Sequence, residues 1–131
     1  MGQQWEELLN EYDTKFRFPY FGFNWDALED CLRDLDWIPR KEVIVYHPVL
    51  PTLEIKELKI YLEILRDITK HWTQNEEHSF NAYFNYDDYS TVYKIMKHIW
   101  IDIIHYLNRI YHSILWHNDT RDVHNHIKWS L

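Results

Sequence analysis

Between residues 26 and 34 the chain carries four carboxylates at helical spacing, and such a cluster can attract a cationic group or a metal ion. At about 100° per residue, one face of a helix over this segment holds Asp26, Glu29, Asp30 and Asp34, with Arg33 as its one cation. Asp30 lies four residues from both Asp26 and Asp34, and each of these two like-charge pairs costs about 0.2–0.5 kcal/mol of helix stability. The cluster therefore indicates a surface kept for a cationic partner, with an ordinary solvated helix face as the alternative.

A metal site is the weaker interpretation, because these carboxylates step along a helix and do not converge on one point. A row of histidines, His98, His105 and His112, also fails as a shared site. Its members are seven residues apart, which is about 10.5 Å along a helix, whereas zinc lies about 2 Å from each ligand nitrogen. The sequence contains no Gly-rich phosphate loop and no nucleophile elbow. We therefore expect no catalytic residue, no metal site, no cofactor and no enzyme activity.

The opposite face of the same segment is apolar and predicts how the carboxylates are held. It consists of Ala27, Leu28, Cys31, Leu32 and Leu35, which would pack against the core. An aromatic loop, Pro19-Tyr20-Phe21-Gly22, precedes the helix. Gly22 is one of two glycines in the chain, so we expect either backbone freedom or a close approach there. Cys31 is the single cysteine and is expected to be a small buried thiol.

This loop and helix resemble the signature of the barstar family, the small intracellular inhibitors of secreted bacterial ribonucleases. The resemblance lies in Pro19-Tyr20-Phe21-Gly22, in Asn24-Trp25-Asp26-Ala27-Leu28, in Asp30-Cys31-Leu32, and in the closing Trp37 and Pro39. It covers a small part of the chain, yet the ordered combination is specific. It implies a small parallel sheet packed with helices.

In that family the loop and the acidic helix plug the active site of the nuclease, and carboxylates take the place of RNA phosphates. The resemblance matches Tyr20, Asp26 and Asp30 to contact positions and makes Asp30 the central phosphate mimic. Asp67 matches an acidic position on a later helix, where it is a peripheral contact or a solvated charge. The predicted toxin-binding set is Tyr20, Asp26, Glu29, Asp30, Arg33, Asp34 and Asp67.

Four positions in this segment depart from the best-known member of the family. That member has a tryptophan where this chain has Glu29, and Thr-Gly-Trp where this chain has Arg33-Asp34-Leu35. The changes at Glu29 and Arg33 alter complementarity to the original nuclease. The resemblance therefore implies an immunity protein that binds its own cognate basic ribonuclease toxin one to one, and inhibition of barnase itself does not follow.

Length and composition fit one small domain. The 131 residues, 46% of them hydrophobic, provide material for a single core. The opening Met-Gly-Gln-Gln-Trp-Glu-Glu shows no secretory signal, and no apolar run approaches the roughly 20 residues of a membrane span. We therefore expect a cytoplasmic protein without membrane contact. The net charge of −7 argues against direct binding of nucleic acid.

The rest of the chain predicts an α/β fold, with a barstar-like inhibitor domain over residues 1–89. We expect a helix from Trp5 to Lys15, a strand from Glu42 to Tyr46, a helix from Leu53 to Trp72 and a strand from Ser79 to Asn85. A helix between two strands makes a βαβ unit, so the two strands should be parallel. The sheet is expected to have two to three strands.

Residues 90–131 form a C-terminal helical extension outside the resemblance. From Ser90 to Asn118 the chain has no glycine or proline, which predicts one long helix or a helical pair, followed by a polar tail. Its broad apolar stripe, which includes Ile103 and Ile110, must be covered. We expect the extension to pack on residues 1–89 as part of a single domain. A homodimer seam is one alternative, and with it a structural homo-oligomerisation module as the alternative function. Contact of the stripe with an auxiliary surface of the toxin is another.

Overall fold

The structure is a computed structural model that describes residues 4–102, 114–117 and 127–130. In chain order its elements are α1 (Gln4–Phe16), α2 (Trp25–Asp34), β1 (Glu42–His47), α3 (Ile55–Thr73), β2 (Ser79–Asn85), the 3-10 helix η1 (Tyr86–Asp88), α4 (Tyr89–Asp102), β3 (Ile114–His117) and β4 (Ile127–Ser130). None of the helices in this part of the chain is long and apolar enough to cross a bilayer.

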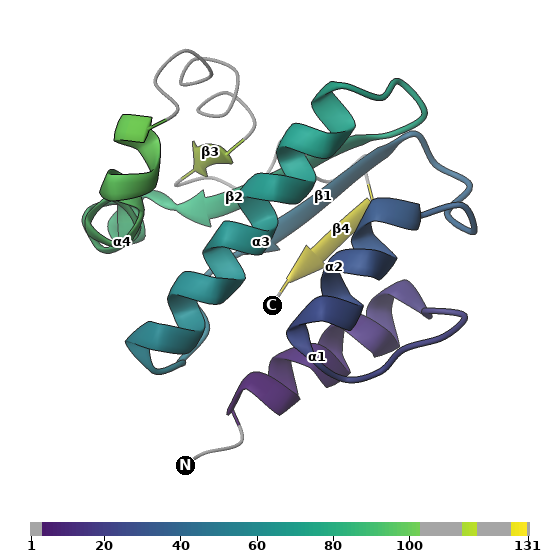
Figure 1. The fold of residues 1–131 in the computed structure, drawn as a ribbon, viewed down its shortest axis with the longest axis horizontal. Coiled ribbons are helices and arrows are strands. Elements are labelled where there is room, and N and C mark those ends of the chain that lie inside the picture. The colour runs from purple at the N-terminus through teal and green to yellow at the C-terminus, as the bar shows by residue number, and fades with distance from the viewer. Residues whose placement is uncertain (1–3, 103–113, 118–126, 131) are drawn as a thin grey trace.

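The strands form one parallel sheet in the order β3-β2-β1-β4 (Figure 1). β1 and β2 lie side by side, from Glu42 opposite Ser79 to His47 opposite Phe84. α3 connects these two strands and packs on β2, since parallel neighbours need a crossover connection. The α/β fold class is therefore confirmed, with a small parallel sheet packed with helices. The strands predicted at 42–46 and 79–85 are confirmed as well.

The helices share one hydrophobic core with the sheet. Figure 1 shows α3 lying across β1 and β2, with α2 beside α3. The ring centroids of Trp5 on α1 and Trp25 on α2 are 6.5 Å apart, which places these two helices in contact. The helices predicted at 5–15 and 53–72 are confirmed to within two residues at each end. Core side chains come from all of these elements and include Leu9, Tyr12, Phe16, Leu28, Leu32, Val45, Ile68 and Ala82.

β1 is covered on both of its faces. Val43 and Val45 face the helical core, and Ile44 and Tyr46, which point the other way, are buried too. In β2, by contrast, only every second residue is buried. A central parallel strand covered on both faces accounts for the unbroken apolar run in the sequence of β1.

A chain of hydrogen bonds runs through this core. Nδ1 of His47 lies 3.0 Å from the carbonyl oxygen of Tyr83, which can only accept, so Nδ1 carries the proton. Nε2 of His47 then accepts from the Tyr61 hydroxyl at 2.6 Å, and the Tyr61 oxygen accepts from the Tyr12 hydroxyl at 2.7 Å. Burial lowers the pKa of His47 to about 4, so the ring is neutral at neutral pH. Each polar group in this series of hydrogen bonds, from Tyr12 to the Tyr83 carbonyl, therefore has a partner.

The C-terminal region departs from the sequence prediction. α4 confirms a helix at the start of the extension, but Ile114–His117 forms strand β3 and is not part of a helix that ends at Asn118. β3 pairs with β2, and β4, within the predicted polar tail, pairs with β1. The sheet thus has four strands where two to three were expected. The prediction failed because the open edges of β1 and β2 offer backbone groups that further strands can satisfy, which periodicity does not register.

Other predictions for the extension fall outside the described residues. This holds for the apolar positions Ile103 and Ile110 and for the histidines His105 and His112. The homodimer seam and the division of the chain at residue 89 therefore stay predictions.

Candidate functional site

The loop before α2 ends in a cap that fixes where the helix starts. Asn24 has an extended backbone, and its Oδ1 accepts a hydrogen bond from the N–H of Ala27 at 2.7 Å. The preceding Phe23 has a φ of 54°, a left-handed conformation that is uncommon for phenylalanine. Gly22 does not have a positive φ, and a Cβ there would lie 3.4 Å from the Cβ of Ala27, which is an ordinary van der Waals distance. Neither expectation for Gly22 is therefore confirmed, and the unusual backbone lies one residue later.

The apolar face of α2 holds the helix on the core. Leu28, Cys31, Leu32 and Leu35 have no exposed surface. Nε1 of Trp72 on α3 donates to the carbonyl oxygen of Leu32 at 2.8 Å, which is one of the four terminal carbonyls of α2. Burial raises the pKa of the Cys31 thiol to about 11, as expected for a structural thiol and not for a nucleophile.

Asp26 and Asp30 are exposed on the other side of α2. Within the described part of the chain, neither carboxylate forms a hydrogen bond or an ion pair. Asp26 lies in the first turn, where the helix dipole favours an anion. Asp30 lies one turn later and gains less from the dipole. Both carboxylates keep their acceptor sites open to solvent or to a partner.

Tyr20 and Asp34 tie the loop to the C-terminal end of α2. The Tyr20 hydroxyl donates to Oδ2 of Asp34 at 3.1 Å, and Sγ of Cys31 donates to the carbonyl oxygen of Tyr20 at 3.3 Å. The Tyr20 side chain nevertheless stays 57% exposed. Hydrogen bonds with Asp34 raise the pKa of Tyr20 and of Asp36. Loop and helix therefore present one continuous surface, with Tyr20 at its edge.

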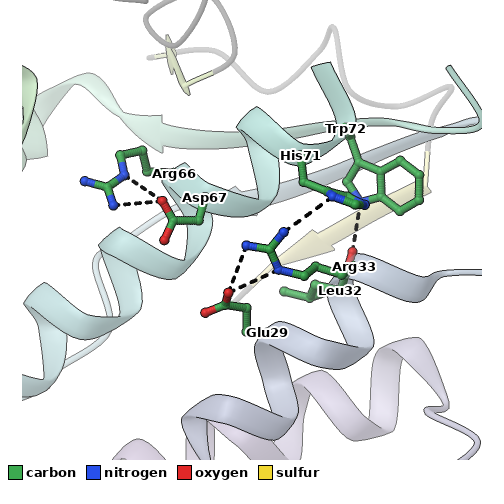
Figure 2. A network of polar contacts seen from close by, with 7 residues as sticks. All are labelled: Glu29, Leu32, Arg33, Arg66, Asp67, His71 and Trp72. Atoms are coloured by element: carbon green, nitrogen blue, oxygen red, sulfur yellow. Dashed lines mark hydrogen bonds and ion pairs between the residues drawn. The ribbon is translucent and has the colours of Figure 1, made fainter. Parts of the chain in front are cut away.

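Glu29 and Arg33 form an ion pair on α2 (Figure 2). Nε and Nη2 of Arg33 both donate to Oε2 of Glu29, at 3.1 and 2.9 Å. Nη1 of Arg33 lies 3.4 Å from Nδ1 of His71 on α3. Partial burial, and after it the charge of Arg33, lowers the pKa of His71. Arg33 thus links α2 to α3, a role that the sequence did not predict.

Asp67 lies on α3 and accepts hydrogen bonds from its neighbour Arg66, at 2.9 Å from Nε and 2.7 Å from Nη2. A hollow of about 260 Å³ lies between α2 and α3, lined by Arg33, Asp67, Lys70, His71 and Gln74. The structure therefore brings Asp67 and Arg33 to one hollow. Contact of Asp67 with a partner stays a prediction.

Sequence reasoning missed Lys70, His71 and Gln74 as parts of this surface. For Lys70 and His71 the available signal was their spacing from Asp67 along the predicted helix at 53–72, because residues three and four apart share a helix face. Gln74 lies beyond the predicted end of that helix. The described residues contain no group of three or more His, Cys, Asp or Glu side chains arranged to hold a metal ion.

Comparison with known proteins bears on this arrangement. The family model described as Barstar (barnase inhibitor) matches residues 2–85. This range contains α1, α2, β1, α3 and β2, and with them every predicted toxin-binding residue. No curated protein and no solved structure matches the chain. Because the match covers more than half of its length, the chain belongs to the barstar family of ribonuclease inhibitors.

Proposed function

We propose that the chain is the immunity protein of a basic bacterial ribonuclease toxin. It inserts Tyr20 and the polar face of α2 into the active site of the toxin, one inhibitor per toxin; this polar face consists of Asp26, Glu29, Asp30, Arg33 and Asp34. The observation that carries the proposal is the state of Asp26 and Asp30. They are exposed and without an internal partner among the described residues, on a helix whose opposite face is buried. Membership of the barstar family supports a ribonuclease as the class of target.

The chemistry of the target explains why carboxylates suit this surface. A ribonuclease cleft must bind a polyanion with Arg, Lys and His, and a carboxylate can accept two parallel hydrogen bonds from one guanidinium. Asp30 would take the place of the central phosphate, with Asp26 and Asp34 one turn away on either side. Because Asp26 and Asp30 form no ion pair with any residue that the structure describes, none of these contacts has to break when they enter the cleft. Opposite charge would also steer encounter, at rates up to about 10⁸–10⁹ M⁻¹s⁻¹ at low salt.

The other predicted residues would act at the edge of this contact. Tyr20 would offer its exposed ring beside the carboxylates, and Asp67 would contact the toxin from α3. Occlusion of this kind needs no catalytic residue and no cofactor in the inhibitor. The cytoplasm is the compartment we propose for it, where the toxin would be neutralised inside the producing cell.

The test begins with capture of the partner from native lysate at low salt, with the tagged chain as bait, and its identification by mass spectrometry. RNA cleavage by the captured protein is then measured as the purified chain is titrated into it. The parallel bait is Asp30→Asn, which keeps the shape of the side chain and removes its charge. The matched control is Glu7→Gln, an exposed acid on α1. We expect a basic ribonuclease in a 1:1 complex with the wild type, and an unchanged affinity for Glu7→Gln.

For Asp30→Asn we expect the dissociation constant to rise about 30- to 5,000-fold, since removal of one partner from a buried charge pair costs about 2–5 kcal/mol. The association rate of the wild type should fall as salt is raised. Equal inhibition by the wild type and Asp30→Asn would contradict the proposed role of Asp30. If the tagged chain captured only further copies of itself, that result would favour the oligomerisation module instead.

A further inference from the structure

The hollow between α2 and α3 is cationic in character, although the chain as a whole is acidic. Arg33 and Lys70 line it together with His71, Gln74 and Asp67. Its one carboxylate, Asp67, already accepts two hydrogen bonds from Arg66. The hollow therefore differs in chemistry from the carboxylates of Asp26 and Asp30 on the same helix.

Arg33 is held in place from two sides (Figure 2). Glu29 accepts from its Nε and Nη2, and Nδ1 of His71 faces its Nη1. A guanidinium always carries its protons, so Nδ1 of His71 can only accept in this contact. A guanidinium has five N–H groups, and these contacts use three of them. Two donors therefore remain on a side chain that is 39% exposed at the edge of the hollow.

A fixed arginine in this position is unfavourable for binding to a uniformly basic cleft. Like charges brought together across an interface weaken binding and exclude the wrong partner. An acceptor on the partner would reverse the sign of the effect, because a carboxylate can bind the two remaining donors of Arg33. The hollow leaves room for such a side chain, at about 260 Å³.

We propose that the partner nuclease projects an Asp or Glu side chain into the hollow between α2 and α3 to pair with Arg33, and that this contact selects the cognate toxin. The inference rests on the proposed function and adds an acidic group to the otherwise basic surface of the target. Arg33 is then a specificity-determining residue, and Glu29 and His71 are positioning residues that fix its guanidinium.

The experiment uses catalytically silenced barnase displayed on phage as the probe. Surface positions around its active-site cleft each sample Asp, Lys or Ala, and the library is selected against the full-length chain. The parallel baits are Arg33→Glu, Arg33→Gln and a matched control, Lys56→Glu. Lys56 is an exposed cation on α3, 15 residues and so about 22 Å from His71 along the helix. Circular dichroism and thermal unfolding of each bait verify that it is folded.

With the wild type and with Lys56→Glu we expect about tenfold or greater enrichment of Asp at one position or a small cluster of positions on the cleft rim. With Arg33→Glu the same positions should select Lys, and with Arg33→Gln the preference for Asp should disappear. Selection of Asp that is unaffected by either change at Arg33, or no selection of Asp at all, would overturn the inference and leave the proposed function standing. Retention of no library member by any bait would also overturn the inference, because no acidic group on the rim would then pair with Arg33; it would leave the proposed function standing, since binding of barnase itself is not expected.

Discussion

His47 should make the folded state sensitive to acid, and glutamine at this position should remove that sensitivity. The buried ring donates through Nδ1 to the Tyr83 carbonyl and accepts through Nε2 from the Tyr61 hydroxyl. Protonation of His47 would place a charge in the core and a second donor against the Tyr61 hydroxyl. Glutamine can offer one donor and one acceptor to the same two partners, but it does not titrate.

The size of the effect follows from the difference in pKa between the two states. Burial lowers the pKa of His47 from 6.5 to about 4 in the folded chain. The unfolded chain therefore binds the proton first, so the free energy of unfolding falls as the pH drops below 6.5 and the loss is complete below about pH 4. Linkage gives a loss of about 0.8 kcal/mol at pH 6, about 2 kcal/mol at pH 5 and about 3 kcal/mol at pH 4. At pH 7.5 the loss is close to zero.

Urea unfolding followed by tryptophan fluorescence, with the wild type and His47→Gln measured side by side at pH 7.5, 6 and 5, tests this value. Carboxylates and other histidines titrate in both proteins, so the difference between the two curves isolates His47. We expect the stability of the wild type relative to the variant to fall by about 2 kcal/mol between pH 7.5 and pH 5. A difference that stays constant over this range would refute the reasoning, because His47 would then not be held neutral by the fold.

Two further substitutions test how the helices end. Arg17 follows α1 with a φ of 53° and an exposed side chain, so Arg17→Gly should raise the free energy of unfolding by about 0.5–1 kcal/mol in urea unfolding, and a decrease would count against strain at this position. Trp72→Phe removes the indole that donates to the Leu32 carbonyl and should lower the free energy of unfolding by about 1–3 kcal/mol. Unchanged stability of Trp72→Phe would mean that the Leu32 carbonyl finds another donor.

The parts of the fold that the sequence predicted are those where local pattern and tertiary packing agree. α3 shows a long apolar stripe at helical spacing, and β1 is a short β-branched run closed by Pro48. A helix that connects two such strands strongly favours a parallel pair. The type of each of these elements is determined by its own residues, and its bounds were predicted to within two residues.

β3 shows where that reasoning stops. Ile114, Leu115 and Trp116 continue an apolar pattern that suits a helix, and the same residues suit a strand. The choice depends on whether a sheet edge is available, here the edge of β2. Such an edge exists only after β1 and β2 have paired, so no window of sequence contains the information.

The candidate site divides in the same way. The face shared by Asp26 and Asp30 follows from helical spacing, and the Glu29 and Arg33 pair could have been predicted from their separation of four residues. The contact between Arg33 and His71 could not, because it joins residues 38 apart whose distance is set by the packing of α2 on α3. The loop shows the same limit, since the residue with the unusual backbone is Phe23 and not Gly22.

The apolar residues that hold α2 on the core are different from Asp26 and Asp30, the two acids proposed to enter the cleft of the toxin. Leu28, Leu32 and Leu35 are buried, and the cap at Asn24 acts on the backbone. Asp26 and Asp30 add nothing comparable, and their repulsion costs about 0.2–0.5 kcal/mol. Replacement of either acid should therefore leave the fold intact, while inhibition should fall. An ordinary solvated face predicts no effect on inhibition, so this separation of stability from binding distinguishes the two interpretations of the acidic cluster.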